Sequence, residues 1–423
     1  MLPEVAVIGL GRIGLPLAVS FADRGLNVLG IDKDADRLTA ISDSRMPFEE
    51  PGAQATLERV NAAGTLEISN SVADAAAAQH IVLTLGTPSF SHIEIDIGDI
   101  RSVLDELLAL LRPGQSLTLR STIAPGTTEF VAGYLAKHRD FIIGEDIFVA
   151  HCPERIAAGH FMEEIQSLPC IVGGVGEESG ERVGALFSIF GAPIVQTTPV
   201  QAELAKIWTN ILRYANFALP NLLMMDCEQH GANVFDVIEL INRDYPRGGI
   251  AMPGLTGGTC LRKDFAFSEE RSNAPGMLLA VSRVNESVPL FLVEGMKRRI
   301  GSLNGRKIAV LGLAFKGNTD DERDSLAHKL VRMLERELAD VAVHDPLVAT
   351  PTPPFEETVV GAAAVVVAAN HDEFTSPDVL RAIAELTGPD ALIIDPWNCF
   401  GSAQIFGYVS ELSAITNAKV TLP

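Results

Sequence analysis

The sequence predicts an α/β protein with two doubly wound, Rossmann-like parallel-sheet domains, joined by a central helical region. Two observations support this fold class. A strand-like run at 4–8 leads into a glycine-rich turn, and a second strand-like run that starts at Lys307 opens another alternation of strands and helices. The length of 423 residues also exceeds what one ordinary core fills. We therefore expect domains at 1–190, 191–300 and 301–423.

The first domain alternates short apolar runs with helical patterns. Residues 4–8 are followed by a glycine-rich turn, a helical pattern and a second strand, which together make a βαβ unit. Further apolar runs that fit buried strands occur at 80–85, 116–120, 147–149 and 170–172. This spacing predicts one parallel sheet that closes near residue 190.

The central region has a different pattern. Residues 198–243 carry apolar side chains at helical spacing and contain one proline, Pro220. Together with the partly helical segment 274–299, this stretch suits a connecting helix that also packs against a second copy of the chain, so we expect a homodimer. After Lys307 the pattern returns to strands and helices and includes a strand at 393–397.

Charge and cysteine content exclude several classes of function. The formal charge is -21, from 33 basic and 54 acidic side chains, and such a chain repels nucleic acids and anionic membrane surfaces. Five cysteines without a CxxC pair, and histidines without ligand spacing, indicate neither a disulfide framework nor a metal site. No apolar run approaches the ~20 residues of a membrane helix. We expect a cytoplasmic protein without a nucleic-acid, membrane or metal partner.

The turn Gly9-Leu-Gly-Arg12-Ile13-Gly14 predicts a dinucleotide site. Its three glycines allow a tight turn, close approach to a pyrophosphate and close packing of helix on strand. The second strand ends in Asp32, at the offset expected for an acid that binds ribose hydroxyls. Such an acid repels a 2′-phosphate and favours NAD over NADP, although the adjacent Lys33 weakens this preference. A purely structural role for Asp32 at the strand end stays open.

Cys260 lies in the segment GLTGGTCLRKD, directly after a glycine-rich turn. Arg262, Lys263 and a helix that starts near the cysteine would favour the thiolate, which is the form that attacks carbonyl carbon. Most free cysteines, however, are small buried hydrophobes. These residues alone do not decide between the two readings.

Together with other segments, this one resembles the UDP-glucose/GDP-mannose dehydrogenase family. The matching segments span nearly the whole chain: 9–14 with Asp32, 86–88, 121–128, Cys152-Pro-Glu-Arg155, 203–210, 257–264 and 312–323. The resemblance implies oxidation of the C6 alcohol of a nucleotide sugar to a carboxylate, with two NAD in succession. In that chemistry Cys260 forms a thiohemiacetal and then a thioester, which water hydrolyses.

The resemblance also implies roles for the other catalytic residues. Lys206 and Asn210 are four residues apart, so on a helix they share a face and can stabilise one oxyanion. Asp264, with Thr122 and a water, is the expected base for the alcohol proton, and Glu154 the expected assistant in thioester hydrolysis. The alternatives are a solvated lysine, a helix cap for Asp264 and a loop salt bridge for Glu154.

Binding residues follow from the same resemblance. Phe315 and Lys316 are expected to face the nucleotide sugar and Arg323 the NAD, while Arg243 or Arg247 either reaches a neighbouring subunit's substrate or is a surface charge. The other implied contacts are Thr87 and Thr122 for the cofactor, and Glu154, Arg155, Lys206, Asn210 and Gly257 for the substrate.

The identity of the sugar rests on two segments, of which the helical stretch 216–242 favours the same branch as the one named next. Cys152-Pro-Glu-Arg155 looks like the branch that oxidises UDP-N-acetylmannosamine or UDP-N-acetylglucosamine. We expect UDP-N-acetylmannosamine, with UDP-N-acetylglucosamine or UDP-glucose as alternatives. Trp397-Asn398 replaces a basic residue of the family pattern, which puts the sugar contacts there in doubt. A single hydride transfer that leaves Cys260 idle, and a nucleotide-sugar-binding protein without turnover, are competing interpretations. His151 and His371 are interpreted as loop hydrogen-bonding groups.

Overall fold

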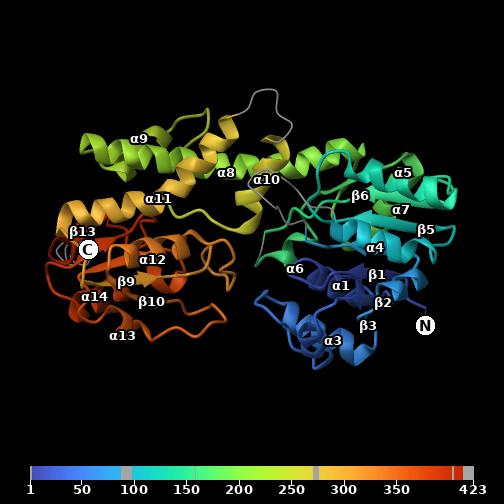
Figure 1. The fold of residues 1–423 in the computed structure, drawn as a ribbon, viewed down its shortest axis with the longest axis horizontal. Helices are drawn as coiled ribbons and strands as arrows, with labels where there is room; N and C mark the ends of the chain where they lie inside the picture. Colours follow the sequence, from blue (N-terminus) through green and yellow to red (C-terminus); the bar gives the residue numbers. More distant parts are fainter. Residues whose placement is uncertain (1, 87–97, 158, 270–275, 403, 413–423) are drawn as a thin grey trace. The chain divides into compact units, whose positions relative to one another are not determined.

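The computed structural model describes residues 2–86, 98–157, 159–269, 276–402 and 404–412. The chain forms two compact units (Figure 1). The first comprises Met1–Thr209 with Ala266–Arg271, and the second comprises Asn210–Phe265 with Ser272–Pro423.

The first unit contains an eight-stranded sheet in the order β3-β2-β1-β4-β5-β6-β7-β8. Its strands are β1 (Val5–Ile8), β2 (Val28–Ile31), β3 (Leu66–Ser69), β4 (His80–Leu83), β5 (Gln115–Leu119), β6 (Ile147–His151), β7 (Cys170–Gly174) and β8 (Ile194–Thr197). All neighbours are parallel except β6 and β7, which are antiparallel. The strand order reverses between β1 and β4. Open α/β sheets bind ligands at such a switch point, beyond the carboxyl ends of the strands.

Helices cover both faces of this sheet, and the strand sequences show why. In β1, Val5 and Val7 face one hydrophobic core while Ala6 and Ile8 face another, so the strand is apolar throughout. The first core includes α1 (Gly14–Asp23), α3 (Ala53–Ala63), α6 (Phe161–Glu164) and α7 (Glu177–Phe187). The second includes η1 (Val72–Ala77), α4 (Gly98–Leu108) and α5 (Thr127–Arg139). Short elements complete the unit: α2 (Ala35–Ser42) and η2 (Ser188–Phe190).

The second unit contains a five-stranded sheet in the order β10-β9-β11-β12-β13. Its strands are β9 (Lys307–Leu311), β10 (Asp340–His344), β11 (Ala364–Val367), β12 (Leu392–Ile394) and the antiparallel β13 (Phe406–Tyr408). One face packs against α11 (Met277–Ile300) and α12 (Leu326–Arg336), and the other against η3 (Asp372–Thr375), α13 (Phe355–Val359) and α14 (Pro377–Leu386).

Helix α8 (Pro199–His230) is continuous from the first unit into the second and is followed by α9 (Val234–Asn242) and α10 (Thr259–Glu269). Pro220 lies inside α8 without ending it. The predicted fold class, two doubly wound α/β sheets with a helical region between them in sequence, is confirmed. The domain limits at 190 and 300 stay predictions, because the two compact units divide the central helices between them.

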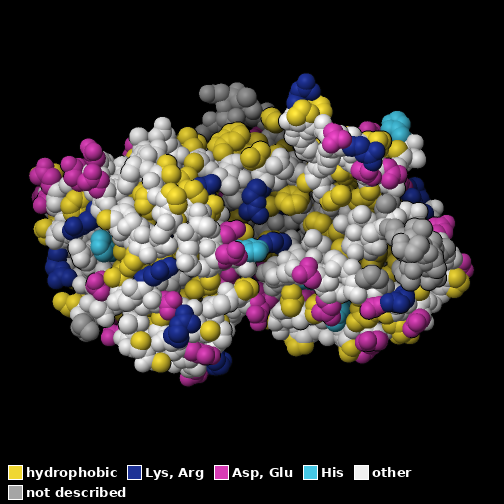
Figure 2. All heavy atoms as spheres, turned by 180° about the vertical axis from the view of Figure 1, so that it is seen from behind, with side chains coloured by type: hydrophobic (Ala, Val, Ile, Leu, Met, Phe, Trp, Pro, Cys, Tyr) yellow, Lys and Arg dark blue, Asp and Glu magenta, His cyan; other side chains and the backbone are white. Residues whose placement is uncertain are grey.

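Charged side chains are distributed over the surface. On the face drawn in Figure 2, Asp and Glu are scattered together with Lys and Arg among the described residues. No helix in the described part of the chain is long and apolar enough to cross a membrane. Within the same residues, no group of three or more His, Cys, Asp and Glu side chains could hold a metal ion.

Candidate active site

The glycine turn after β1 has the geometry of a phosphate-binding loop. Gly9 has a φ of +97°, and a Cβ on Gly14 would lie 1.7 Å from the Gly9 carbonyl oxygen, so neither position accepts a side chain without rearrangement. A Cβ on Gly11 would meet nothing within 4 Å. The turn leads into α1, whose first residue is Gly14 and whose start has no side-chain cap. The amides at this helix end are therefore available to an anion.

Asp32, at the end of β2, is tied to this turn. Its Oδ2 accepts hydrogen bonds from the Leu10 amide (2.6 Å) and from Arg37 (2.8 Å), and its Oδ1 accepts one from the Asp34 amide (2.9 Å). Burial alone would raise the pKa of Asp32, but these hydrogen bonds outweigh it and hold the pKa below its usual value. Oδ1 keeps a lone pair that a ribose hydroxyl could use. Lys33 next to it is exposed, and Arg12 stacks over the Phe48 ring at 5.1 Å.

Glu203 connects α8 to the loop that carries Thr122. The side chain is fully buried and accepts hydrogen bonds from the Gly126 amide (2.7 Å), the Thr128 amide (2.9 Å) and the Thr128 hydroxyl (2.6 Å). It thereby caps the start of α5. Lys206 lies one turn later on α8, half-buried, and its charge lowers the pKa of His151, although burial is the larger cause. The resulting pKa of His151, about 3, keeps that imidazole neutral.

Glu154 forms a buried ion pair with Arg120. Its Oε2 lies 2.6 Å from Arg120 Nη2, and its Oε1 accepts the amides of Arg155 (2.7 Å) and Ile156 (2.8 Å). Arg120 also donates to the carbonyl oxygen and the Sγ of Cys152, each at 3.1 Å. Burial alone would lower the pKa of Arg120, but Glu154 and the neighbouring thiols raise it. The loop salt bridge left open by the sequence is thus present, and the hydrolytic role of Glu154 stays a prediction.

The nucleophile loop, residues 254–260, leads into α10. Cys260 is exposed and is the second residue of that helix, where the helix dipole favours a thiolate. The loop packs closely on its surroundings within the second unit: Gly258 donates its amide to the Asp324 carbonyl oxygen (3.1 Å), and a Cβ on Gly257 would lie 2.8 Å from that same oxygen. Gly257 therefore serves the packing of the loop, whether or not it also contacts substrate.

Asp264 lies one turn after Cys260 and is fully buried. Its Oδ2 accepts a hydrogen bond of 2.6 Å from the Asn210 side-chain amide, and Lys263 Nζ lies 3.6 Å from its Oδ1. A residue of α8 and a residue of α10 are thereby joined directly. Because Lys206 is four residues before Asn210 on the continuous α8, both side chains project from one face of that helix.

Phe315, Lys316 and Arg323 lie in the loop between β9 and α12. The Phe315 ring lies against Gly258, so that a Cβ there would be 2.8 Å from it. Lys316 is half-buried. Arg323 is bidentate to Asp321, at 2.8 and 2.7 Å, which is the first cause of its raised pKa, and the Cys260 thiol adds to the shift. Phe315 and Arg323 are thus both close to the nucleophile loop.

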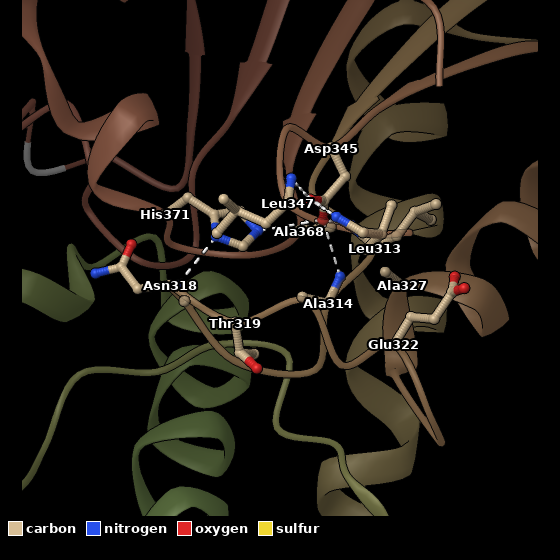
Figure 3. A network of polar contacts seen from close by, with 12 residues as sticks. Leu313, Ala314, Asn318, Thr319, Glu322, Ala327, Asp345, Leu347, Ala368 and His371 are labelled. Atoms are coloured by element: carbon tan, nitrogen blue, oxygen red, sulfur yellow. Dashed lines mark hydrogen bonds and ion pairs between the residues drawn. The ribbon is translucent and has the colours of Figure 1, made fainter. Parts of the chain in front are cut away.

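Asp345, directly after β10, holds the loop between β9 and α12 through hydrogen bonds (Figure 3). Its Oδ2 accepts the amides of Leu313 (2.6 Å) and Ala314 (3.0 Å) and lies 3.2 Å from His371 Nε2, while its Oδ1 accepts the amides of Leu347 (2.9 Å) and Val348 (3.2 Å). His371 Nδ1 accepts the Asn318 amide (3.0 Å). Burial opposes ionisation, yet these hydrogen bonds lower the pKa of Asp345 well below its usual value. His371 and His151 hydrogen-bond to loop and backbone groups, as interpreted from the sequence.

The remaining sequence-predicted residues have mixed surroundings, and one of them lies outside the described chain. Arg243 follows α9, is exposed and pairs with Glu239, and Arg247 is exposed and stacks over the Tyr245 ring at 5.4 Å. Thr122 is half-buried in the loop after β5, and Arg155 donates weakly to the Pro169 carbonyl oxygen (3.4 Å). Thr87 lies outside the described residues.

Sequence reasoning missed three buried charged groups: Arg120, Glu203 and Asp345. Asp345 had a readable signal, because it follows the second strand of its domain as Asp32 does in the first. Glu203 lies in a segment used for the family resemblance, yet only its lysine and asparagine were assigned roles. Nothing in the sequence around Arg120 distinguishes it from a charge at the end of a strand.

Comparison with known proteins decides the family. Three models of the UDP-glucose/GDP-mannose dehydrogenase family match this chain: the NAD binding domain at 3–191, the central domain at 200–287 and the UDP binding domain at 309–402. The chain belongs to this family. It is an NAD-dependent UDP-sugar dehydrogenase. The glycine turn, the open position at Gly11 and the remaining lone pair of Asp32 fit NAD.

Several relatives of this dehydrogenase are named. A UDP-N-acetyl-D-mannosamine dehydrogenase from Pyrococcus horikoshii is 34% identical over 88% of this chain and 90% of its own. A solved structure of the UDP-D-ManNAc dehydrogenase from that organism has a TM-score of 0.87 at 33% identity and covers 94% of this chain and 96% of its own. The structure of a Staphylococcus aureus UDP-N-acetyl-mannosamine dehydrogenase has a TM-score of 0.84 at 31% identity, over 93% of this chain and 94% of its own.

Proposed function

We propose that the chain oxidises C6 of UDP-N-acetylmannosamine to the carboxylate in two steps, through a thiohemiacetal and a thioester on Cys260. The observation that carries this proposal is the arrangement on α10. An exposed thiol lies at the helix start, and one turn later a buried carboxylate accepts a 2.6 Å hydrogen bond from Asn210. A thiol and a carboxylate spaced by four residues share one helix face and can serve one substrate carbon.

The first oxidation needs a base for the alcohol proton. Asp264 is a suitable acceptor, because Asn210 orients its Oδ2 and its side chain is fully buried. Asn210 and Lys206, one turn apart on α8, supply the donors for an alkoxide oxygen. NAD, held by the turn of Gly9, Gly11 and Gly14 and by Asp32, supplies the hydride acceptor for both oxidations.

The second oxidation needs the sulfur. An aldehyde carbon attacked by the Cys260 thiolate carries sulfur, an oxyanion and one hydrogen. Loss of that hydrogen as hydride leaves a thioester. Water then attacks the thioester, the C–S bond breaks, and the thiolate and the carboxylate are released. Across both steps one alcohol and one water give one carboxylate, two hydrides and three protons. The aldehyde carbon can lose its second hydride only after the thiol has added to it, which explains the need for a thiol in a dehydrogenase.

The sugar is assigned from relatives. Both named relatives act, by their names, on UDP-N-acetylmannosamine, and the Cys152-Pro-Glu-Arg155 segment agrees with that branch. Lys316 and Phe315 of the UDP binding domain are proposed to hold the nucleotide sugar, and Glu154 and Arg155 are proposed as further substrate contacts. Arg243 or Arg247 is proposed to reach the substrate of a neighbouring subunit, since both are exposed.

The test counts reduced cofactor per sugar. The purified protein is supplied with limiting UDP-N-acetylmannosamine and excess NAD. We expect two NADH per sugar from the wild type and no more than one from Cys260→Ala, because only the second oxidation needs the sulfur. Cys227→Ala, which removes a buried thiol of α8, is the control and should retain full stoichiometry. One NADH per sugar from the wild type, unchanged in Cys260→Ala, would show a single-hydride enzyme instead.

The sugar is tested separately with UDP-N-acetylmannosamine, UDP-N-acetylglucosamine, UDP-glucose and GDP-mannose. We expect the highest kcat/KM for UDP-N-acetylmannosamine. A higher value for either alternative UDP-sugar would reassign the substrate without affecting the chemistry. Tight binding of a UDP-sugar with no NAD reduction across the panel would indicate a binding protein without turnover.

The active assembly is proposed to be a homodimer. Large apolar side chains on α8 are exposed within the second unit, namely Leu212 (60%), Leu219 (58%) and Leu222 (52%). Their spacing of seven and three residues places them on one stripe of the helix. A water-facing stripe of leucines is unfavourable unless another surface covers it, and a second copy of α8 would be a self-complementary cover.

A further inference from the structure

Trp397 lies against the first residue of the nucleophile loop. A Cβ on Gly254 would be 2.4 Å from two carbons of the six-membered ring of the Trp397 indole and 2.5 Å from a third. The ring face therefore rests on the Gly254 backbone, and no other residue fits beneath it without displacing the ring. Gly254 has no φ in the left-handed region, so the need for glycine here is steric rather than conformational.

Trp397 is itself held on two sides. Its Nε1 donates to the Ala368 carbonyl oxygen at the end of β11 (3.2 Å). Asp395, which is fully buried, holds the turn that carries the tryptophan, because it accepts the amides of Cys399 (3.0 Å) and Phe400 (2.9 Å). The indole is thus a rigid element of the β12–β13 loop.

The backbone of Gly254 is also anchored to α8. The Gly254 amide donates to Asn221 Oδ1 (2.9 Å), and Asn221 donates in turn to Asn285 on α11 (2.9 Å); both asparagines are fully buried. The start of the nucleophile loop is therefore clamped between an asparagine pair and an indole. Leu255, the next residue, packs into the core of the second unit. The contacts at Gly257 and Gly258 lie closer to Cys260 and involve the β9–α12 loop.

We propose that Trp397 is a positioning residue for the nucleophile: by its contact with Gly254, the indole fixes the position of the loop that leads to Cys260. The proposal rests on the proposed role of Cys260. Trp397 belongs to the UDP binding domain, so this contact ties the domain that holds the nucleotide directly to the loop that carries the reacting sulfur. The tryptophan stands where the family pattern has a basic residue, so here the position is used for packing against the loop rather than for charge.

The test is a double-mutant cycle between the two residues. Gly254→Ala places a methyl group where the benzene part of the indole lies, and Trp397→Phe removes that part of the ring. A displacement of about 1 Å at a nucleophile costs about a hundredfold in rate, so we expect Gly254→Ala to lower kcat about a hundredfold with KM changed less than about threefold. Gly388→Ala is the matched control, because a Cβ there would meet nothing within 4 Å.

The double variant decides the proposal. If the indole sets the loop position, Gly254→Ala with Trp397→Phe recovers kcat to within about threefold of Trp397→Phe alone, because the smaller ring leaves room for the methyl group. Independent losses that multiply, or a Gly254→Ala variant with unchanged kcat, would overturn the proposal. Loss of the fold is recognised by the thermal midpoint of each variant, and a variant with a lowered midpoint but a normal kcat also counts against positioning.

A spectroscopic measurement reports the contact without turnover. The chain has two tryptophans, so Trp208→Phe leaves Trp397 as the only indole emitter. In that background we expect Gly254→Ala to shift the emission and to slow alkylation of Cys260 by iodoacetamide, with no change from Gly388→Ala. Unchanged emission and alkylation would overturn the contact. Failure of the nucleophile itself is distinguishable, since it would appear as two NADH per sugar from Cys260→Ala while this cycle is unaffected.

Discussion

At the scale of single residues, the candidate site combines one exposed group with several buried charges. Cys260 is exposed, whereas Asp264, Glu203 and Asp345 are buried, and each of the three accepts a hydrogen bond from a neighbouring element. Buried carboxylates are tolerated only when such donors replace water. The donors therefore fix the position of each carboxylate.

Replacing Asp264 by Asn should separate chemistry from structure. The amide keeps the shape but cannot accept the alcohol proton, so we expect kcat to fall by at least about a hundredfold with KM little changed. Steady-state kinetics with the nucleotide sugar would measure both. A raised KM with an unchanged kcat would indicate that Asp264 only orients Asn210. The control is Asp390→Asn, at an exposed position of the second unit.

Asp345→Asn should destabilise the second unit. The carboxylate accepts four backbone amides, and the NH2 group of an asparagine would face two of them, so we expect a loss of about 1–3 kcal/mol in the free energy of unfolding. Because the folded pKa is lowered, the contribution is present above the unfolded pKa near 4 and is lost as the pH falls below it. Denaturant unfolding of the wild type and of Asp345→Asn at pH 7 measures this loss, and equal free energies of unfolding would contradict the prediction.

At the scale of elements, one half-buried and one fully buried histidine make the first sheet sensitive to acid. His80 on β4 shares a 2.7 Å hydrogen bond with Ser116 on β5, and burial, followed by the charge of Arg182, lowers its pKa to about 4. His151 on β6 is fully buried, with a pKa of about 3. A lowered histidine pKa means that the unfolded chain binds more protons, so stability is retained above the unfolded pKa of about 6.5 and falls as the pH drops below it.

We therefore expect stability to decline between pH 6.5 and pH 4, by up to about 1.4 kcal/mol per pH unit for each histidine. His80→Gln should reduce this slope by the contribution of one histidine. The measurement is urea unfolding as a function of pH for the wild type and the variant. An equal pH dependence of the unfolding free energy in the wild type and the variant would show that His80 is protonated in the folded state as readily as in the unfolded state.

Particular elements show how much of the structure could be predicted from the sequence. The apolar strand β1 and the glycine turn after it were predictable, because burial on both faces and phosphate binding leave strong local patterns. The continuity of α8 through Pro220 was not, because an interior proline locally disfavours a continuous helix. Nor was the contact of Trp397 with Gly254, since residues that meet across more than 140 positions leave no periodic signal. The chemistry of Cys260 could be proposed because its neighbours in sequence carry it.

At the scale of the whole molecule, the leucine stripe on α8 predicts self-association. Leu212→Glu combined with Leu219→Glu would place charges on an interface that a second copy is proposed to cover, so we expect the dimer to dissociate. Light scattering after gel filtration would measure the mass, which should fall by half. Arg213→Glu, at an exposed neighbour off the stripe, is the control and should leave the mass unchanged. A monomeric wild type would contradict the proposal.

The saturation of Asp345 has a consequence for the order of events during a catalytic cycle. Each sheet ends its second strand in an aspartate, but only Asp32 keeps acceptor capacity, since five donors already surround Asp345. The sheet of the second unit therefore cannot provide a second dinucleotide-binding site. On the proposed chemistry, the first reduced nicotinamide must depart and a fresh one must arrive while the half-finished sugar stays tethered to sulfur. The lifetime of this covalent bond to sulfur, rather than the rate of either oxidation, then determines whether a turnover is completed.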